Sequence, residues 1–153
     1  MIIFVDADAC PVAVKEILYK ASSRWGMKLI FVANQKMWIP SSPLISQIVV
    51  SSGADVADDH IVSMVEPGDL VISADIPLAD RVIKKSGIVL DPRGVFLTAD
   101  NIGPRLALRD LMDGLRSEGM VTGGPGAFGP KEKQAFANHL DRILARAQKA
   151  QNH

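Results

Sequence analysis

The stretch Ile2-Ile3-Phe4-Val5-Asp6-Ala7-Asp8-Ala9-Cys10-Pro11 decides the fold, because an apolar run ends there in two carboxylates and a proline. A run without polar alternation is typical of a strand buried on both faces, and Pro is favoured at the first position of a helix. The same arrangement recurs at 69–77, where an apolar run ends at Asp75 and Pro77 follows. Two such turns in one parallel sheet would place both acids at its carboxyl edge, where α/β proteins bind ligands.

Strands and helices are expected to alternate along the chain. The apolar runs predict strands at 2–5, 29–33, 47–51, 70–73 and 88–90. Helical spacing and stop signals predict helices at 11–25, 58–65, 77–86, 104–118 and 131–149, with a Gly- and Pro-rich loop at 119–130. Such alternation favours an α/β fold of three layers around a mostly parallel, five-stranded sheet, with helices at the C-terminus. We expect a single domain over 1–153, with the sheet core in 1–98 and a C-terminal helical part in 99–153 packed on it.

Composition excludes several classes of protein. The chain has 153 residues, with 17 acidic and 17 basic side chains, so no net charge would attract a polyanion or a membrane surface. No apolar run reaches the roughly 18 residues of a membrane span. A single cysteine cannot form an internal disulfide and fits a reducing compartment. We therefore expect a cytoplasmic protein with no membrane partner, in which any nucleic-acid binding rests on a local basic patch or on metal ions.

The candidate site is a set of aspartates: Asp6, Asp8, Asp75 and either Asp58 or Asp59. Mg²⁺ and Mn²⁺ prefer carboxylate oxygens, and acids converging from separate elements can hold such ions for phosphoryl chemistry. Helix capping is the structural alternative, since Asp is a common N-cap residue. It would explain any one of these acids, but four at one sheet edge favour a metal site.

Several other residues could contribute to the site, and most of them also have a purely structural interpretation. Arg93 could hold a phosphodiester backbone or lie on an ordinary solvated surface, and Asn34 follows the second strand at the same edge. Trp38, in a loop with nearby prolines, could stack on a base or fill a contact between two copies of the chain. Cys10 could be a thiolate at a helix start, but a small buried residue is the better interpretation, because position 16, where a phosphatase-type Arg would stand, is Glu.

Several motifs, spread in order along nearly the whole chain, resemble the bacterial YaiI/YqxD family. They are Val5-Asp-Ala-Asp-Ala-Cys-Pro11, Val32-Ala-Asn-Gln35, Asp55-Val-Ala-Asp58, Gly68-Asp-Leu-Val-Ile-Ser-Ala-Asp-Ile-Pro-Leu-Ala79, Pro92-Arg-Gly94 and Gly123-Gly-Pro125. That family is similar to PIN domains, which are Mg²⁺- or Mn²⁺-dependent ribonucleases with a parallel sheet in the order 3-2-1-4-5.

The resemblance implies functional residues at named positions. The metal-binding acids would be Asp6, Asp58 and Asp75, with Ser73 as the hydroxyl of the turn that precedes Asp75. PIN nucleases usually carry a further acid after the second strand and its helix, whereas residues 34–54 contain no Asp or Glu. Asp8 is the residue that could replace it, as a ligand or by orienting the attacking water.

These observations lead to one main hypothesis and two alternatives. The first is a metal-dependent phosphodiesterase, a ribonuclease, with Asp6, Asp8, Asp58 and Asp75 as catalytic residues and Ser73, Asn34 and Arg93 as substrate contacts. The second is a non-catalytic module that binds RNA, a nucleotide or a protein through the same edge, which the missing acid favours. The third is a haloacid-dehalogenase-like phosphatase that uses Asp6 and Asp8, with Lys84 or Lys85 as its lysine. The sequence gives no direct signal for a homo-oligomer.

Overall fold

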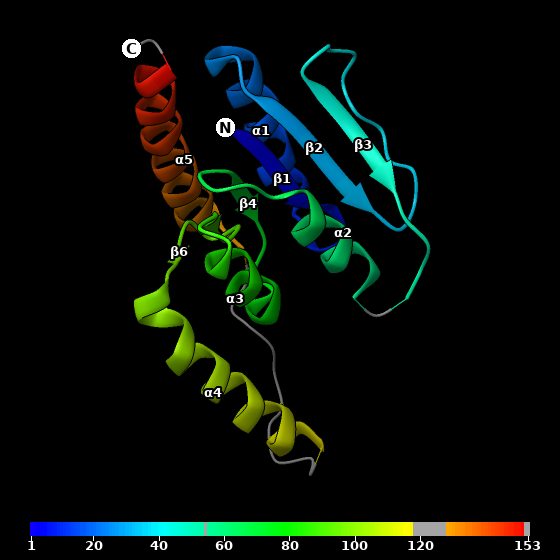
Figure 1. The fold of residues 1–153 in the computed structure, drawn as a ribbon, viewed down its shortest axis with the longest axis vertical. Coiled ribbons are helices and arrows are strands. Elements are labelled where there is room, and N and C mark those ends of the chain that lie inside the picture. Colours follow the sequence, from blue (N-terminus) through cyan, green and yellow to red (C-terminus); the bar gives the residue numbers. More distant parts are fainter. Residues whose placement is uncertain (54, 118–127, 152–153) are drawn as a thin grey trace.

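The computed structural model describes residues 1–53, 55–117 and 128–151 and has an α/β fold around one six-stranded sheet (Figure 1). Its strands are β1 (Ile2–Asp6), β2 (Lys28–Ala33), β3 (Ile45–Val49), β4 (Leu70–Ile72), β5 (Ile88–Leu90) and β6 (Phe96–Leu97). They lie in the order β3-β2-β1-β4-β5-β6. The first five are parallel, and β6 is antiparallel to β5. The predicted order 3-2-1-4-5 is therefore confirmed for the parallel strands.

Helices cover both faces of the sheet. They are the 3₁₀ turn η1 (Ala7–Ala9) and the α-helices α1 (Val12–Trp25), α2 (Val56–Met64), α3 (Ile76–Lys84), α4 (Ala99–Ser117) and α5 (Pro130–Gln151). α1 and α5 share one apolar core with the sheet, and α2 and α3 share the other. Figure 1 shows α4 projecting away from these layers. None of the helices in the described ranges is long and apolar enough to cross a membrane.

The central strand explains why the opening run is uniformly apolar. Ile3 and Val5 are buried in the core under α1 and α5, whereas Phe4 is buried in the core under α2 and α3. Neighbouring residues of a strand point to opposite faces, so a strand covered on both sides needs apolar residues at every position. The first polar residue, Asp6, stands where β1 leaves the covered region.

The main differences between the structure and the sequence prediction concern β6, β3 and α4. A sixth strand, β6, joins the sheet, and β3 begins and ends two residues earlier than predicted. α4 begins at Ala99 instead of Pro104, because Asn101 closes its first turn: its Oδ1 accepts the Thr98 N–H at 2.8 Å. The predicted loop at 119–130 lies mostly outside the described residues.

Candidate functional site

Ser73 ties together two of the predicted acids at the carboxyl edge of the sheet. Val5 and Ile72 are partners in the β1–β4 register, which brings Asp6 beside Ser73. The Ser73 hydroxyl donates to Asp6 Oδ2 at 3.2 Å and accepts the Asp75 backbone N–H at 3.0 Å. Because Ser73 is only 2% exposed, its hydroxyl fixes the spacing between Asp6 and the β4–α3 turn. A direct contact between Ser73 and a substrate stays a prediction.

Asp58 belongs to the same group of acids, although it comes from a third element. It lies in the first turn of α2, and burial, followed by the charges of Asp75 and Asp6, raises its pKa to about 6. A side-chain hydrogen bond with Asp75 raises the pKa further. Burial also raises the pKa of Asp6, against the Ser73 hydrogen bond, and the charges of Asp75 and Asp8 add to the rise. When ionised, the carboxyls of β1, α2 and the β4–α3 turn therefore repel one another.

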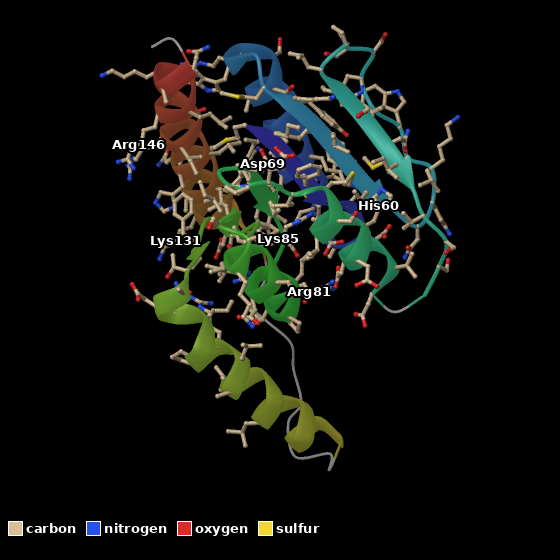
Figure 2. The ribbon with its side chains drawn as sticks, viewed as in Figure 1. His60, Asp69, Arg81, Lys85, Lys131 and Arg146 are labelled. Atoms are coloured by element: carbon tan, nitrogen blue, oxygen red, sulfur yellow. The ribbon has the colours of Figure 1, made fainter. Side chains whose placement is uncertain are left out.

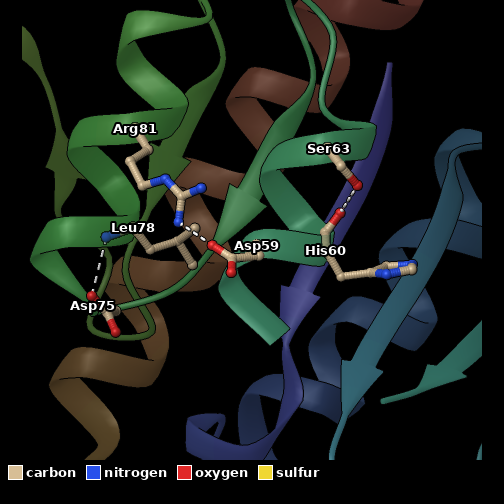
Figure 3. Close-up of polar contacts among 6 residues, drawn as sticks. All are labelled: Asp59, His60, Ser63, Asp75, Leu78 and Arg81. Atoms are coloured by element: carbon tan, nitrogen blue, oxygen red, sulfur yellow. Dashed lines mark hydrogen bonds and ion pairs between the residues drawn. The ribbon is translucent and has the colours of Figure 1, made fainter. Parts of the chain in front are cut away.

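The neighbouring Asp59 has a different partner. Its Oδ1 accepts a hydrogen bond from the Arg81 guanidinium at 2.7 Å, in an ion pair between α2 and α3 (Figure 3). The sequence left Asp58 and Asp59 open as alternatives, and the structure brings Asp58 to Asp6 and Asp75. His60, the next residue, accepts a hydrogen bond from Ser63 Oγ at its carbonyl, at 2.6 Å.

Helix capping accounts for only one of the predicted acids. Asp75 is the N-cap of α3, and its Oδ1 accepts the Leu78 N–H at 3.1 Å (Figure 3). Asp58 lies inside the first turn of α2, whose N-cap residue is Asp55. Asp8 caps no helix, since its carboxylate binds an amide of another strand end. The structural alternative is thus correct for Asp75 and leaves Asp6, Asp8 and Asp58 unexplained.

Asp8 reaches the end of β2. Its two carboxylate oxygens lie 3.0 and 3.3 Å from the backbone nitrogen of Asn34. This exposed acid therefore stands at the strand end that is followed by no acid of its own, residues 34–54 having neither Asp nor Glu. The Asn34 side chain is half-buried, and its Oδ1 has no hydrogen-bond partner among the described residues. Asp8 and Asn34 are thus adjacent, although their roles in chemistry stay predictions.

Arg93 lies at the same edge but further along the sheet. It follows β5, in a turn where Asp91 Oδ1 accepts the N–H groups of Arg93 and Val95, each at 2.9 Å. β5 is two strands from β1, which corresponds to about 10 Å. Backbone hydrogen bonds, and then the charge of Arg93, lower the pKa of Glu132, so this guanidinium is near the start of α5. Arg93 is therefore placed beside the acids and not among them.

Two further sequence interpretations can be judged from contacts. Burial raises the pKa of Cys10 to about 12, which agrees with a buried thiol and not with a thiolate. Lys84 pairs with Asp80 at 2.9 Å, and Lys85 Nζ donates to the Val62 carbonyl. Both lysines lie at the end of α3 opposite Asp75, with Lys85 beside α2 (Figure 2). This placement counts against the dehalogenase-like alternative, which needs a lysine near Asp6.

The donor set suits a hard divalent cation. It consists of carboxylates, and no basic group is among the causes that shift the pKa of Asp6 or Asp58. Bringing a cation between repelling carboxylates would reverse the rise in their pKa. In the described part of the chain, however, no three Asp, Glu, His or Cys side chains stand close enough to hold a metal ion as arranged. The acids fit the ion chemically, and binding would require them to draw closer.

One feature escaped the sequence analysis: the loop after β2 is clamped by Gln47. The Gln47 side chain accepts the Met37 N–H at 2.9 Å and donates to the Met37 carbonyl at 2.8 Å. A glutamine in a strand carries no sequence signal for such a clamp. The next residue, Trp38, is 75% exposed and lines a cavity of about 410 Å³ against α1.

Comparison with known proteins gives the family of the chain. The family model described as "Uncharacterized BCR, YaiI/YqxD family" matches residues 4–146. The chain belongs to this family. It is 56% identical to a UPF0178 protein of Colwellia psychrerythraea over 99% of this chain and 100% of the relative. Similar proteins of Maridesulfovibrio salexigens and Saccharophagus degradans are 56% and 52% identical, over 96% and 97% of this chain and 97% and 99% of their own. No solved structure matches the chain.

Proposed function

We propose that this YaiI/YqxD family member is a PIN-like, divalent-cation-dependent phosphodiesterase that cleaves RNA. The observation that carries the proposal is the mutual repulsion of Asp6, Asp58 and Asp75, which come from three separate elements. Burying like charges together is costly unless a cation compensates them. The ion pair between α2 and α3 involves Asp59 and not Asp58, so Arg81 does not account for the position of Asp58.

Asp6, Asp58 and Asp75 would hold Mg²⁺ or Mn²⁺, which when bound would polarise a phosphoryl oxygen and lower the pKa of water. Ser73 donates to Asp6 and accepts the Asp75 amide, which holds these two residues at neighbouring strand ends. Asp8 is exposed and stands at the neighbouring strand end, where it would accept a hydrogen bond from the attacking water or complete the ligand set. Arg93 would contact a phosphate of the RNA strand further along the edge of the sheet.

The test is hydrolysis of single-stranded RNA of mixed sequence in the presence of Mn²⁺. Asp6→Asn and Asp75→Asn are expected to lower the rate by at least about a hundredfold, comparable to the loss of one electrostatic group at an active site. Asp59→Asn and Asp80→Asn are matched controls, because these acids pair with Arg81 and Lys84. Cleavage that persists unchanged in Asp6→Asn and Asp75→Asn would reject the assignment.

A non-catalytic binding module is the second candidate. The observation in its favour is that, as arranged, the described residues contain no three potential ligands close enough for a metal ion. It predicts RNA or nucleotide binding at this edge without turnover. Single-turnover assays with excess protein separate the two candidates, since a module leaves the RNA intact at any Mn²⁺ concentration.

A further inference from the structure

The cavity beside Trp38 has the features of a nucleobase subsite. It measures about 410 Å³ and is lined by Val12, Lys15, Glu16, Tyr19, Met37 and Trp38. The indole is 75% exposed, an unusual placement for the largest apolar side chain. Tyr19 meets it edge to face at a centroid distance of 6.0 Å, so Tyr19 covers at most one of its two faces. An open aromatic face in a lined cavity is the usual platform for an unstacked base.

Contacts with the rest of the fold hold both walls of this cavity. Tyr19 is itself packed edge to face on the buried ring of Phe31, at 5.7 Å. The loop that carries Trp38 is held at Asn34 by Asp8 and at Met37 by both ends of the Gln47 amide. Fixing the loop before a ligand arrives removes the entropy cost of ordering it, which favours binding over a merely mobile surface loop.

The cavity adjoins the acidic edge. Asp8, two residues after β1 ends and four before Val12, holds the loop on one side of the cavity, and α1 forms the other. Cys10 lies between Asp8 and Val12 in the sequence, and the charges of both Lys15 and Asp6 act on its thiol. An RNA strand with a phosphate at Asp6 could therefore place an adjoining nucleotide in this cavity.

The cavity also offers a charge for a phosphate. The Lys15 ammonium makes no hydrogen bond or ion pair with any other residue in the described ranges, and Glu16, which also lines the cavity, is at an exposed position. A lysine beside an aromatic platform matches the alternation of base and phosphate in a nucleic-acid strand. If the surface around Trp38 instead packed against a second copy of the chain, a lysine at this position would not be needed.

We propose that the cavity between α1 and Trp38 binds a base of single-stranded RNA, stacked on the indole, with the adjoining phosphate at Lys15. The inference rests on the proposed function for its substrate and makes that substrate specific: the strand must be unpaired where it crosses α1. A base in a duplex stays stacked on its neighbours and cannot enter the cavity.

The test uses the whole protein and a short, labelled, single-stranded oligoribonucleotide in EDTA, so that cleavage cannot contribute. Fluorescence anisotropy gives the Kd, and tryptophan emission reports contact with the indole. Trp38→Ala should weaken binding by about 5- to 150-fold, which corresponds to ~1–3 kcal/mol per stacked base. Trp38→Phe should keep most of the affinity, because Phe retains a face, while RNA-induced quenching disappears since only Trp25 remains.

Charge and strand state supply the controls. Lys15→Gln should reduce the slope of log Kd against log salt by about 0.7, the value for one phosphate of a single strand. Lys20→Gln, at an exposed position of the same helix and outside this cavity, should leave the slope unchanged. Duplex RNA of the same sequence should bind at least about tenfold more weakly, as one lost stacking contact costs that much.

The outcomes separate this inference from the proposed function. An unchanged Kd in Trp38→Ala, or equal binding of duplex, overturns the inference even if Mn²⁺-dependent cleavage occurs. Binding that depends on Trp38 without any cleavage supports the inference and removes the phosphodiesterase. If Trp38 emission instead follows protein concentration, and Trp38→Ala converts a dimer to a monomer, the face is a contact between copies and the inference is wrong.

Discussion

At the scale of single residues, the site is organised by repulsion among three acids. Asp58 has its pKa raised to about 6 by burial and by the charges of Asp75 and Asp6, while Asp59, one position on, is neutralised by Arg81. Two adjacent aspartates of one helix turn therefore differ in chemistry because they face different partners. This difference makes the site testable by stability measurements that need no substrate.

Asp58→Asn should stabilise the metal-free protein at alkaline pH. The unfolded carboxyl has a pKa of 3.8 and the folded one about 6, so the native state holds the proton longer. Folding stability therefore falls as pH rises between these values, and the full penalty applies above 6. Removing the charge should add about 1 kcal/mol at pH 8, a value reduced for solvent screening because Asp58 is partly exposed, and almost nothing near pH 4.

Urea unfolding of wild type and variant at both pH values measures this difference. Asp59→Asn is the matched control, because it removes an exposed ion pair with Arg81 and should change stability little at either pH. A pH-independent effect of Asp58→Asn would contradict the electrostatic account.

At the scale of elements, the β4–α3 turn combines a structural and a chemical task in Asp75. Its carboxylate caps α3 through the Leu78 N–H and also raises the pKa of Asp58. Ser73 links this turn to the end of β1 through Asp6. A residue that caps a helix can therefore also belong to a site, and neither role excludes the other.

Two substitutions at Asp75 separate these roles. Asn caps helices as well as Asp does, so Asp75→Asn should not destabilise the fold, and it should lose stabilisation by Mn²⁺. Asp75→Ala removes the same charge and the cap as well, so it should be about 1 kcal/mol less stable than Asp75→Asn. Denaturant unfolding in EDTA gives this comparison, and equal stabilities would show that the cap contributes nothing.

The turn after β5 contains a glycine, Gly94, whose substitution should lower the stability of the fold. Gly94 has a φ of +89°, and a Cβ there would lie 2.6 Å from the Phe136 backbone nitrogen of α5. Gly94→Ala should therefore cost about 2–4 kcal/mol, from the strained backbone together with the clash. Gly68→Ala is the control: its φ is also positive, but no atom lies within 4 Å of the added Cβ. A similar loss in both variants would show that contact with α5 is unimportant.

At the scale of the whole molecule, the sequence predicts the layers of the fold better than it predicts the short edge strand β6 and the first residue of α4. Buried strands such as β1 are recognisable because both faces require apolar side chains, and the turns at Asp6 and Asp75 follow from strand ends. β6 has only Phe96 and Leu97, too few residues for a periodic signal. Pro104 suggested a helix start, yet it lies inside α4, because the Thr98–Asn101 contact sets the first turn.

The candidate site was predictable only in part for a related reason. The strand order places Asp6 and Ser73 at one edge, and that order follows from topology. The hydrogen bond of Asp8 with Asn34 and the Gln47 clamp on Met37 depend on distances between loops, which residue spacing does not encode. The cavity at Trp38 therefore emerged only from the structure.

The proposed phosphodiesterase requires Asp6, Asp58 and Asp75 to meet around one divalent cation. Anomalous diffraction from crystals soaked in Mn²⁺ tests this most directly, because it locates the ion without knowledge of a substrate. We expect a manganese peak within coordination distance, about 2.0–2.2 Å, of carboxylate oxygens of these three residues, and its loss in Asp75→Asn. Crystals that show no manganese there, or a peak that Asp75→Asn leaves in place, would contradict the account.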